Sequence, residues 1–137
     1  MRYRAFPLLG LAIGCAGSSY TVTATAPTPK PVTDAFTCVR AGITPIGYTQ
    51  SSYDLEAHRL TARRYDDTIR RPDVRFRRMV DELEIEVRPD SGGRSAIVVS
   101  SRTFAEYVTE RGQTLIQEAA SDSVQAAGQA LVAACGH

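Results

Sequence analysis

Apolar residues recur with two different spacings along residues 34–137, and the change of spacing separates helices from strands. A first helix is expected from Asp34, which suits the N-cap position, to Pro45, which stops it. Its apolar stripe has helical spacing and consists of Ala35, Phe36, Val39 and Ile43.

A last helix is expected to begin at Ser121 or Asp122 and to end at Gly136. Its stripe also has helical spacing and consists of Val124, Ala127, Gly128, Leu131, Ala134 and Cys135. Gly128 weakens this helix but permits close approach to a neighbouring element.

Between the helices the pattern is typical of strands. Strands at about 46–52 and 57–66, joined by a turn at Tyr53–Asp54, form a first hairpin in which Leu60 and Ala62 share one face.

A second hairpin follows an exposed connection at 66–73. Its first strand alternates the apolar residues Leu83, Ile85 and Val87 with the acidic residues Glu82, Glu84 and Glu86. The cluster 89–93 is a turn, and 94–101 is the returning strand. Residues 103–120 receive no firm assignment.

These elements predict one α+β domain over 34–137. We expect an antiparallel sheet of about four strands with the N- and C-terminal helices packed on one face and a charged second face.

The chain begins with a basic and then an apolar segment. Arg2 and Arg4 precede a short apolar run that ends in Leu11-Ala12-Ile13-Gly14-Cys15. This run is far shorter than the roughly 20 residues that span a bilayer as a helix. The segment resembles the bacterial lipobox, with Ala12 as a departure from its most common pattern.

The resemblance implies that residues 1–14 are a lipoprotein signal peptide and that Cys15 receives a diacylglyceryl group and becomes the mature N-terminus. Ala16, where an Asp would retain the protein at the inner membrane, implies an outer-membrane anchor facing the periplasm. The alternative is an ordinary secretory signal with a cleavage site at Ala24-Thr25-Ala26.

Residues 15–33 predict a disordered tether rich in Thr, Ser, Ala and Pro. At about 3 Å per residue it would hold the domain roughly 50 Å from the bilayer. It is either a spacer through the envelope or a leader with no length requirement.

Cys38 and Cys135 lie on or beside the apolar faces of the two helices. With Cys15 lipidated, an oxidising compartment favours a disulfide between them. The alternative is two buried thiols.

The net charge is +1, which does not suggest a nucleic-acid partner, but the charges are unevenly placed. Residues 59–78 hold eight Arg against three acids, and residues 81–122 hold nine acids against four Arg. We expect Arg59 and Arg63 to meet the acidic row across the sheet if their strands are neighbours.

Within the basic stretch, five arginines flank a loop: Arg70, Arg71, Arg75, Arg77 and Arg78. They either bind an anionic lipid or glycan, because guanidinium groups suit phosphate, or form a solvated loop balanced by the acidic half. The three glutamates 82, 84 and 86 are interpreted as the solvated face of a strand rather than an acid/base or metal set.

No catalytic, metal or cofactor motif is found, and His58 is expected to be a solvated side chain. The chain resembles the small α+β domains of several bacterial envelope lipoproteins over about 30 residues of helix, Gly-Tyr, strand, turn and strand.

The hypothesis is therefore a non-enzymatic envelope lipoprotein, a structural, adaptor or assembly component anchored to the membrane by Cys15 and contacting an envelope protein. The first alternative is a binding module for anionic lipid or glycan through the Arg-rich stretch 59–78. An enzyme is disfavoured.

Overall fold

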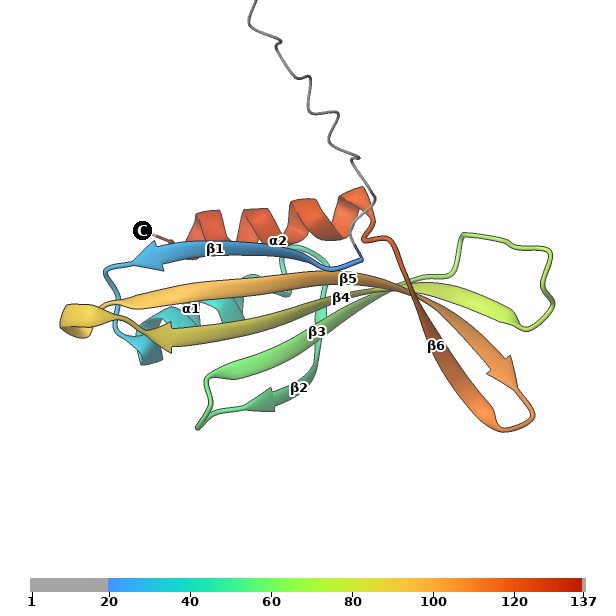
Figure 1. Ribbon diagram of the computed structural model, residues 1–137, viewed down its shortest axis with the longest axis horizontal. Helices are drawn as coiled ribbons and strands as arrows, with labels where there is room; N and C mark the ends of the chain where they lie inside the picture. Colours follow the sequence, from blue (N-terminus) through green and yellow to red (C-terminus); the bar gives the residue numbers. More distant parts are fainter. Residues whose placement is uncertain (1–19, 137) are drawn as a thin grey trace, which may run out of the picture.

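The computed structural model describes residues 20–136 (Figure 1). Along the chain, the elements are β1 (Val22–Thr28), α1 (Val32–Gly42), β2 (Thr49–Asp54), β3 (Arg59–Asp66), β4 (Phe76–Pro89), a 3-10 turn η1 (Ser91–Gly93), β5 (Ser95–Thr109), β6 (Gly112–Glu118) and α2 (Asp122–Cys135). No helix in this part of the chain is long and apolar enough to cross a membrane.

The six strands form one antiparallel sheet in the order β1-β5-β4-β3-β2, with β6 also paired to β5. β1 pairs with β5 residues 95–101 and β6 with β5 residues 103–109, so β1 and β6 share one edge of the sheet and β2 forms the other. The α+β class is confirmed, but the expected count of about four strands is too low.

One of the additional strands, β1, lies inside the segment expected to be a disordered tether. Its residues Val22, Ala24 and Ala26 alternate with threonines, and the β-branched threonines favour an extended backbone. An edge strand also tolerates Pro27, because only one of its sides donates to the ladder. The disordered assignment is therefore wrong for 22–28, and Cys15 and residues 16–19 lie outside the described residues.

The other additional strand, β6, falls in the unassigned residues 103–120. β5 continues to Thr109, the chain turns at 110–111, and β6 runs back beside it. Gly112 has a φ of 107°, a conformation that glycine adopts without strain.

The first helix begins two residues earlier than expected. Pro31 occupies the N-cap position with φ −62°, and no side chain caps the helix. Asp34 is therefore not the N-cap but lies in the first turn, where its charge still favours the positive end of the helix dipole. In the last helix, the Ser121 hydroxyl accepts a hydrogen bond from the Val124 amide as the cap.

The two helices share one core with the apolar row of the sheet. Residues Leu60, Leu83, Ile85 and Val99 of the sheet are almost completely buried with Val39 and Leu131 of the helices. The close approach predicted for Gly128 is present, because a Cβ there would lie 2.6 Å from the Ser101 hydroxyl.

The long strands extend beyond the helices. Figure 1 shows β6 and the end of β5 projecting away from α1 and α2, next to the loop that joins β3 to β4. We call this projection, residues 67–80 and 103–118, the arm.

The two helices are joined by a disulfide between Cys38 and Cys135, with a sulfur–sulfur distance of 2.13 Å and a Cα–Cα distance of 5.8 Å. The expected pairing is present in the structure. Because the bond joins residues 97 apart, it closes a loop that contains most of the domain.

The double substitution Cys38→Ala with Cys135→Ala should lower the free energy of unfolding by about 2–5 kcal/mol, since the unfolded chain regains the entropy of an open loop. Urea unfolding followed by circular dichroism measures the change. Reductant should destabilise the wild type by a similar amount and leave the variant unaffected. Equal unfolding midpoints for wild type and variant would contradict the stabilising role.

Candidate functional site

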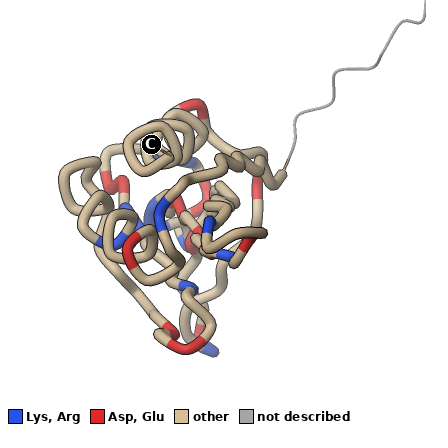
Figure 2. The backbone as a smooth tube through the Cα atoms, turned by 90° about the vertical axis from the view of Figure 1, so that its left-hand side faces the viewer, with Lys and Arg blue, Asp and Glu red and all other residues tan. Residues whose placement is uncertain are grey.

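The arginines of the basic stretch face the carboxylates of the acidic half. Six of the eight form ion pairs with residues 81–122: Arg59 with Glu86, Arg63 with Glu82, Arg64 with Asp81, Arg71 with Glu118, and both Arg77 and Arg78 with Glu106. In Figure 2, blue basic and red acidic positions lie among one another along the folded backbone.

The remaining two arginines bind within their own loop. Arg75 pairs with Asp73 at 3.0 Å, and Arg70 donates hydrogen bonds to the backbone carbonyls of Asp67 and Ile69. The structure therefore does not gather the five predicted anion-binding arginines, 70, 71, 75, 77 and 78, into one unpaired cationic patch.

The expected cross-strand pairing is confirmed on the sheet face opposite the helices. Arg59 lies opposite Glu86 and Arg63 opposite Glu82 in the β3–β4 register, with nitrogen–oxygen distances of 3.3 and 2.9 Å. From the other side, Arg102 of β5 pairs with Glu82 and with Glu84.

The interpretation of the three glutamates as a solvated face is wrong for Glu82. Arginines from both neighbouring strands lie over this carboxylate and leave it only 7% exposed. Glu84 and Glu86 are half-buried. A hydrogen bond from Arg88, with the charge of Arg59 acting in the same direction, holds the pKa of Glu86 below its ordinary value.

The most deeply buried carboxylate, Glu106, belongs to the arm. Its side chain is 3% exposed and accepts a hydrogen bond from Arg78 at 2.5 Å, while Arg77 lies 3.8 Å away. The Arg78 guanidinium also lies 3.8 Å from the centre of the Tyr65 ring, a cation–π contact. Glu106 fixes the start of β4 against β5.

Within the arm, a second ion pair holds the β3–β4 loop to the end of β6. Arg71 donates two hydrogen bonds of 2.6 Å to the Glu118 carboxylate and stacks over the Phe76 ring, which contacts Tyr107 edge-on. These hydrogen bonds lower the pKa of Glu118 and raise that of Arg71. The loop is therefore fastened at its middle and at its end.

A third polar cluster lies where the arm meets α2. The buried Asp81 carboxylate accepts hydrogen bonds from the hydroxyls of Thr103, Ser121 and Ser123 and from Arg64, at 2.8–3.1 Å. Each of its oxygens has two donors, so this carboxylate anchors the first turn of α2 to the sheet. Burial raises the pKa of the neighbouring Tyr48 to about 12, with the Asp81 charge adding to the effect and Arg64 opposing it.

Among residues 20–136, no group of three or more His, Cys, Asp or Glu side chains is placed to hold a metal ion. His58, expected to be solvated, is half-buried with a φ of 48°, and its ring contacts the Phe36 ring edge-on. His137 lies outside the described residues.

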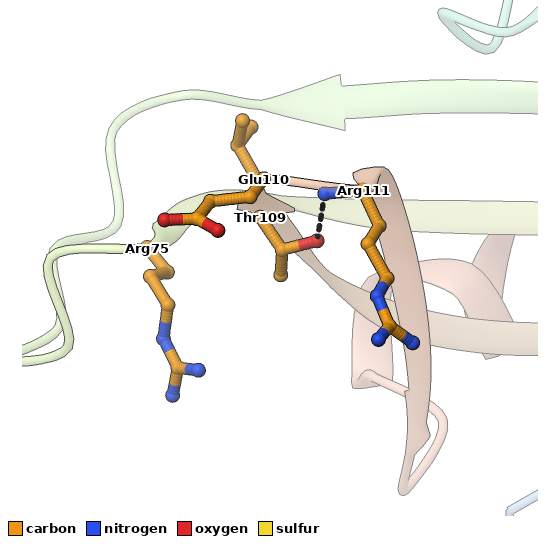
Figure 3. Close-up of a pocket in the computed structure, with 5 residues that line it drawn as sticks. Arg75, Thr109, Glu110 and Arg111 are labelled. Atoms are coloured by element: carbon orange, nitrogen blue, oxygen red, sulfur yellow. Dashed lines mark hydrogen bonds between the residues drawn. The ribbon is translucent and has the colours of Figure 1, made fainter.

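The end of the arm farthest from the helices, residues 74–75 and 108–112, which we call the tip, exposes apolar side chains to solvent. An open cleft of about 600 Å³ is lined by Arg75, Val108, Thr109, Glu110 and Arg111. Figure 3 shows Arg75 and Arg111 on either side of Thr109, with their side chains extending to the same side. Val74, next to the cleft in the sequence, is 98% exposed.

The sequence reasoning missed Glu106, Glu118 and the tip, all of which depend on β5 continuing past residue 101 and returning as β6. Buried and partly exposed residues do alternate from Ser95 to Ala105, but the buried positions include Ser95, Ser101 and Thr103, so the sequence carries no apolar period there.

No family model and no curated protein matches the chain. Several solved structures resemble it, including the following two. A protein from Nitrosospira multiformis has a TM-score of 0.48 and 12% identity, covering 85% of this chain and 93% of that one. A protein from Thermobifida fusca has a TM-score of 0.41 and 12% identity, covering 86% of this chain and 85% of that one.

Replacing Glu118 by Gln should lower the free energy of unfolding at pH 7 by about 1 kcal/mol, because Arg71 loses its charged partner while both groups are partly solvated. The folded-state pKa of Glu118 is depressed, so its contribution is present above the ordinary value of 4.5 and is lost as the pH falls through the folded-state pKa.

The difference between wild type and Glu118→Gln should therefore shrink in urea titrations as the pH is lowered below 4.5. Glu56→Gln, the same change at an exposed position in the β2–β3 turn, controls for altered net charge. A difference that stays constant down to low pH would contradict this role of the ion pair.

Proposed function

We propose that this protein is a lipid-anchored component of the bacterial cell envelope, non-enzymatic and acting as a structural or adaptor domain close to the membrane. The lipobox resemblance at Leu11–Cys15 supplies the anchor, and Ala16 favours the periplasmic side of the outer membrane. The Cys38–Cys135 disulfide supports an oxidising compartment.

The position of β1 bears on whether the signal peptide is of the lipoprotein kind, cleaved before Cys15, or of the ordinary secretory kind, cleaved at residues 24–26. Cleavage at Ala24-Thr25-Ala26 would remove most of β1, which makes the ladder with β5 residues 95–101. Cleavage before Cys15 leaves the whole strand in place. The fold therefore favours a lipoprotein signal over an ordinary secretory signal.

The same strand shortens the expected tether. The described residues begin at Tyr20, five residues after Cys15, so five residues of chain, even fully extended, would keep the lipidated residue within roughly 17 Å of the domain. The domain would then sit next to the bilayer and not about 50 Å away from it.

The adaptor role is supported by the edge of the sheet opposite the anchor. All six residues of β2 are exposed, and among residues 20–136 β2 pairs with β3 alone. An edge strand offers unpaired backbone donors and acceptors to a strand of another protein. With the β1 edge tethered, β2 would face away from the membrane toward such a partner.

The alternative, anionic lipid or glycan binding by the whole stretch 59–78, has less support. Six of its arginines are already paired with the acidic half of the domain. A ligand would have to replace those carboxylates, which costs their hydrogen bonds.

The substitution Cys15→Ala should abolish incorporation of radiolabelled palmitate and release the protein from the membrane fraction, because the acceptor sulfur is lost. Mass spectrometry of the wild type should give an acylated chain that begins at Cys15. The Cys38→Ala, Cys135→Ala variant is the control and should keep its label. A mature chain that begins after Ala26 and carries no acyl group would contradict the proposal.

A photo-crosslinking residue at Ser52 in β2 should give a discrete protein adduct in living cells, because a partner strand would lie along this edge. The same residue at Gln129, which is exposed on α2, is the matched control and should give no such adduct. Identical adduct patterns at both positions would argue against β2 as the docking edge.

A further inference from the structure

Large apolar side chains exposed to solvent concentrate on the arm. Of the nine such side chains among residues 20–136, five belong to it: Ile69, Val74, Val108, Leu115 and Ile116. A sixth, Tyr20, is joined to it by hydrogen bonds from the Gln117 amide to the Tyr20 carbonyl and the Thr21 hydroxyl. Clustered exposure of this kind marks an interaction surface.

The apolar residues of the tip are held next to one another. The Val108 amide donates a hydrogen bond of 2.8 Å to the Arg75 carbonyl, which places the loop residue Val74 close to the end of β5. Val108 pairs with Gln113, so Leu115, two residues further along β6, is its diagonal neighbour on the same face. The Arg71–Glu118 clamp keeps the loop in this position.

Cations and anions are mixed at the tip. Arg75 and Arg111 flank the cleft, but Asp73 pairs with Arg75, and Glu110 also lines the cleft. The tip thus has apolar side chains surrounded by both signs of charge. This composition suits the headgroup layer of a bilayer, in which phosphates and cationic groups lie above the acyl chains.

The position of the proposed lipid anchor indicates that a lipid bilayer, and not another protein, would contact this surface. Cys15 is within roughly 17 Å of Tyr20 when fully extended, and Tyr20 lies beside Gln117 of β6. The strand β6 then runs along the edge of the sheet to the tip at Gly112. With that edge laid along the membrane, both Tyr20 and the tip reach the bilayer.

From these observations we infer that the tip of the arm docks on the bilayer that holds the lipid of Cys15, with Val74 and Val108 in the headgroup layer and Arg75 and Arg111 at its phosphates. The inference rests on the proposed lipid anchor. It assigns an orientation to the domain, with the β1–β6 edge on the membrane and β2 turned away from it.

The chain contains no tryptophan, so one introduced residue reports its own surroundings. The lipidated full-length Val74→Trp protein, reconstituted in phosphatidylcholine vesicles with or without phosphatidylglycerol, should show blue-shifted emission. Lipids brominated near the headgroup should quench this emission severalfold. The control is Leu55→Trp, at a residue 54% exposed in the β2–β3 turn at the other end of β3, and its emission should be unaffected.

The outcomes separate the inference from the proposed function. An acylated Val74→Trp protein that is no more quenched than Leu55→Trp overturns the docking and leaves the anchor intact. Emission that is blue-shifted only in native membranes and is not quenched by lipid indicates a protein partner and also overturns it. A chain without acyl groups overturns both.

A second pair of variants tests the cationic contribution. Arg75→Gln with Arg111→Gln, placed in the Val74→Trp background, should reduce the quenching in phosphatidylglycerol vesicles more than in pure phosphatidylcholine. Arg59→Gln with Arg88→Gln, which removes two exposed arginines from the opposite end of the sheet, should change neither. Equal effects of the two double variants would overturn the placement of the tip arginines at the phosphates.

Discussion

Arginines of the first half of the domain and carboxylates of the second half face each other across β3, β4 and β5, and the rest of the structure depends on that register. The antiparallel pairing that sets Arg63 opposite Glu82 also sets Ala62 opposite Leu83. Since neighbouring residues point to opposite faces, one register places the ion pairs on one face and the core beneath the helices. A shift by one residue would bury the arginines and expose the apolar row.

The pairs are not equal in energy. Arg59 and Arg88 hold Glu86 at the surface, where an ion pair contributes little because water and salt screen it. Glu106 is nearly inaccessible, and removing Arg78, which donates its hydrogen bond, would leave the buried charge with Arg77 alone at 3.8 Å. The surface pairs therefore help to specify the register, whereas the buried carboxylate fixes the start of β4 against β5 in the arm.

Local patterns predicted the parts of the fold that have a regular apolar period. The alternation around Leu83 and Ile85 identified the central strand, and the stripe through Val124 and Leu131 identified the last helix. β1 was missed because its inward residues are Val and Ala, which are too small to dominate a hydrophobic pattern. Its stability comes from pairing with β5, which no local pattern of residues 22–28 contains.

The candidate site was also hard to predict from the sequence, because it depends on pairing between strands that are distant along the chain. The charge segregation between 59–78 and 81–122 was visible, but whether it makes a cationic surface or a neutral one depends on which strands are neighbours. The Arg71–Glu118 clamp joins residues 47 apart and forms only because β6 returns along β5.

The helix-covered part of the sheet and the arm both contribute to the proposed orientation of the domain on the membrane. The disulfide joins α1 to α2, and the Asp81 cluster fastens the first turn of α2 to the sheet at the point where the arm begins. A rigid projection with exposed apolar side chains is a liability for a protein free in solution, since it invites association with other surfaces. Under the proposed anchoring, a membrane would occupy this surface, the projection would be a second point of attachment beside the lipid, and two points would fix the direction in which the β2 edge faces.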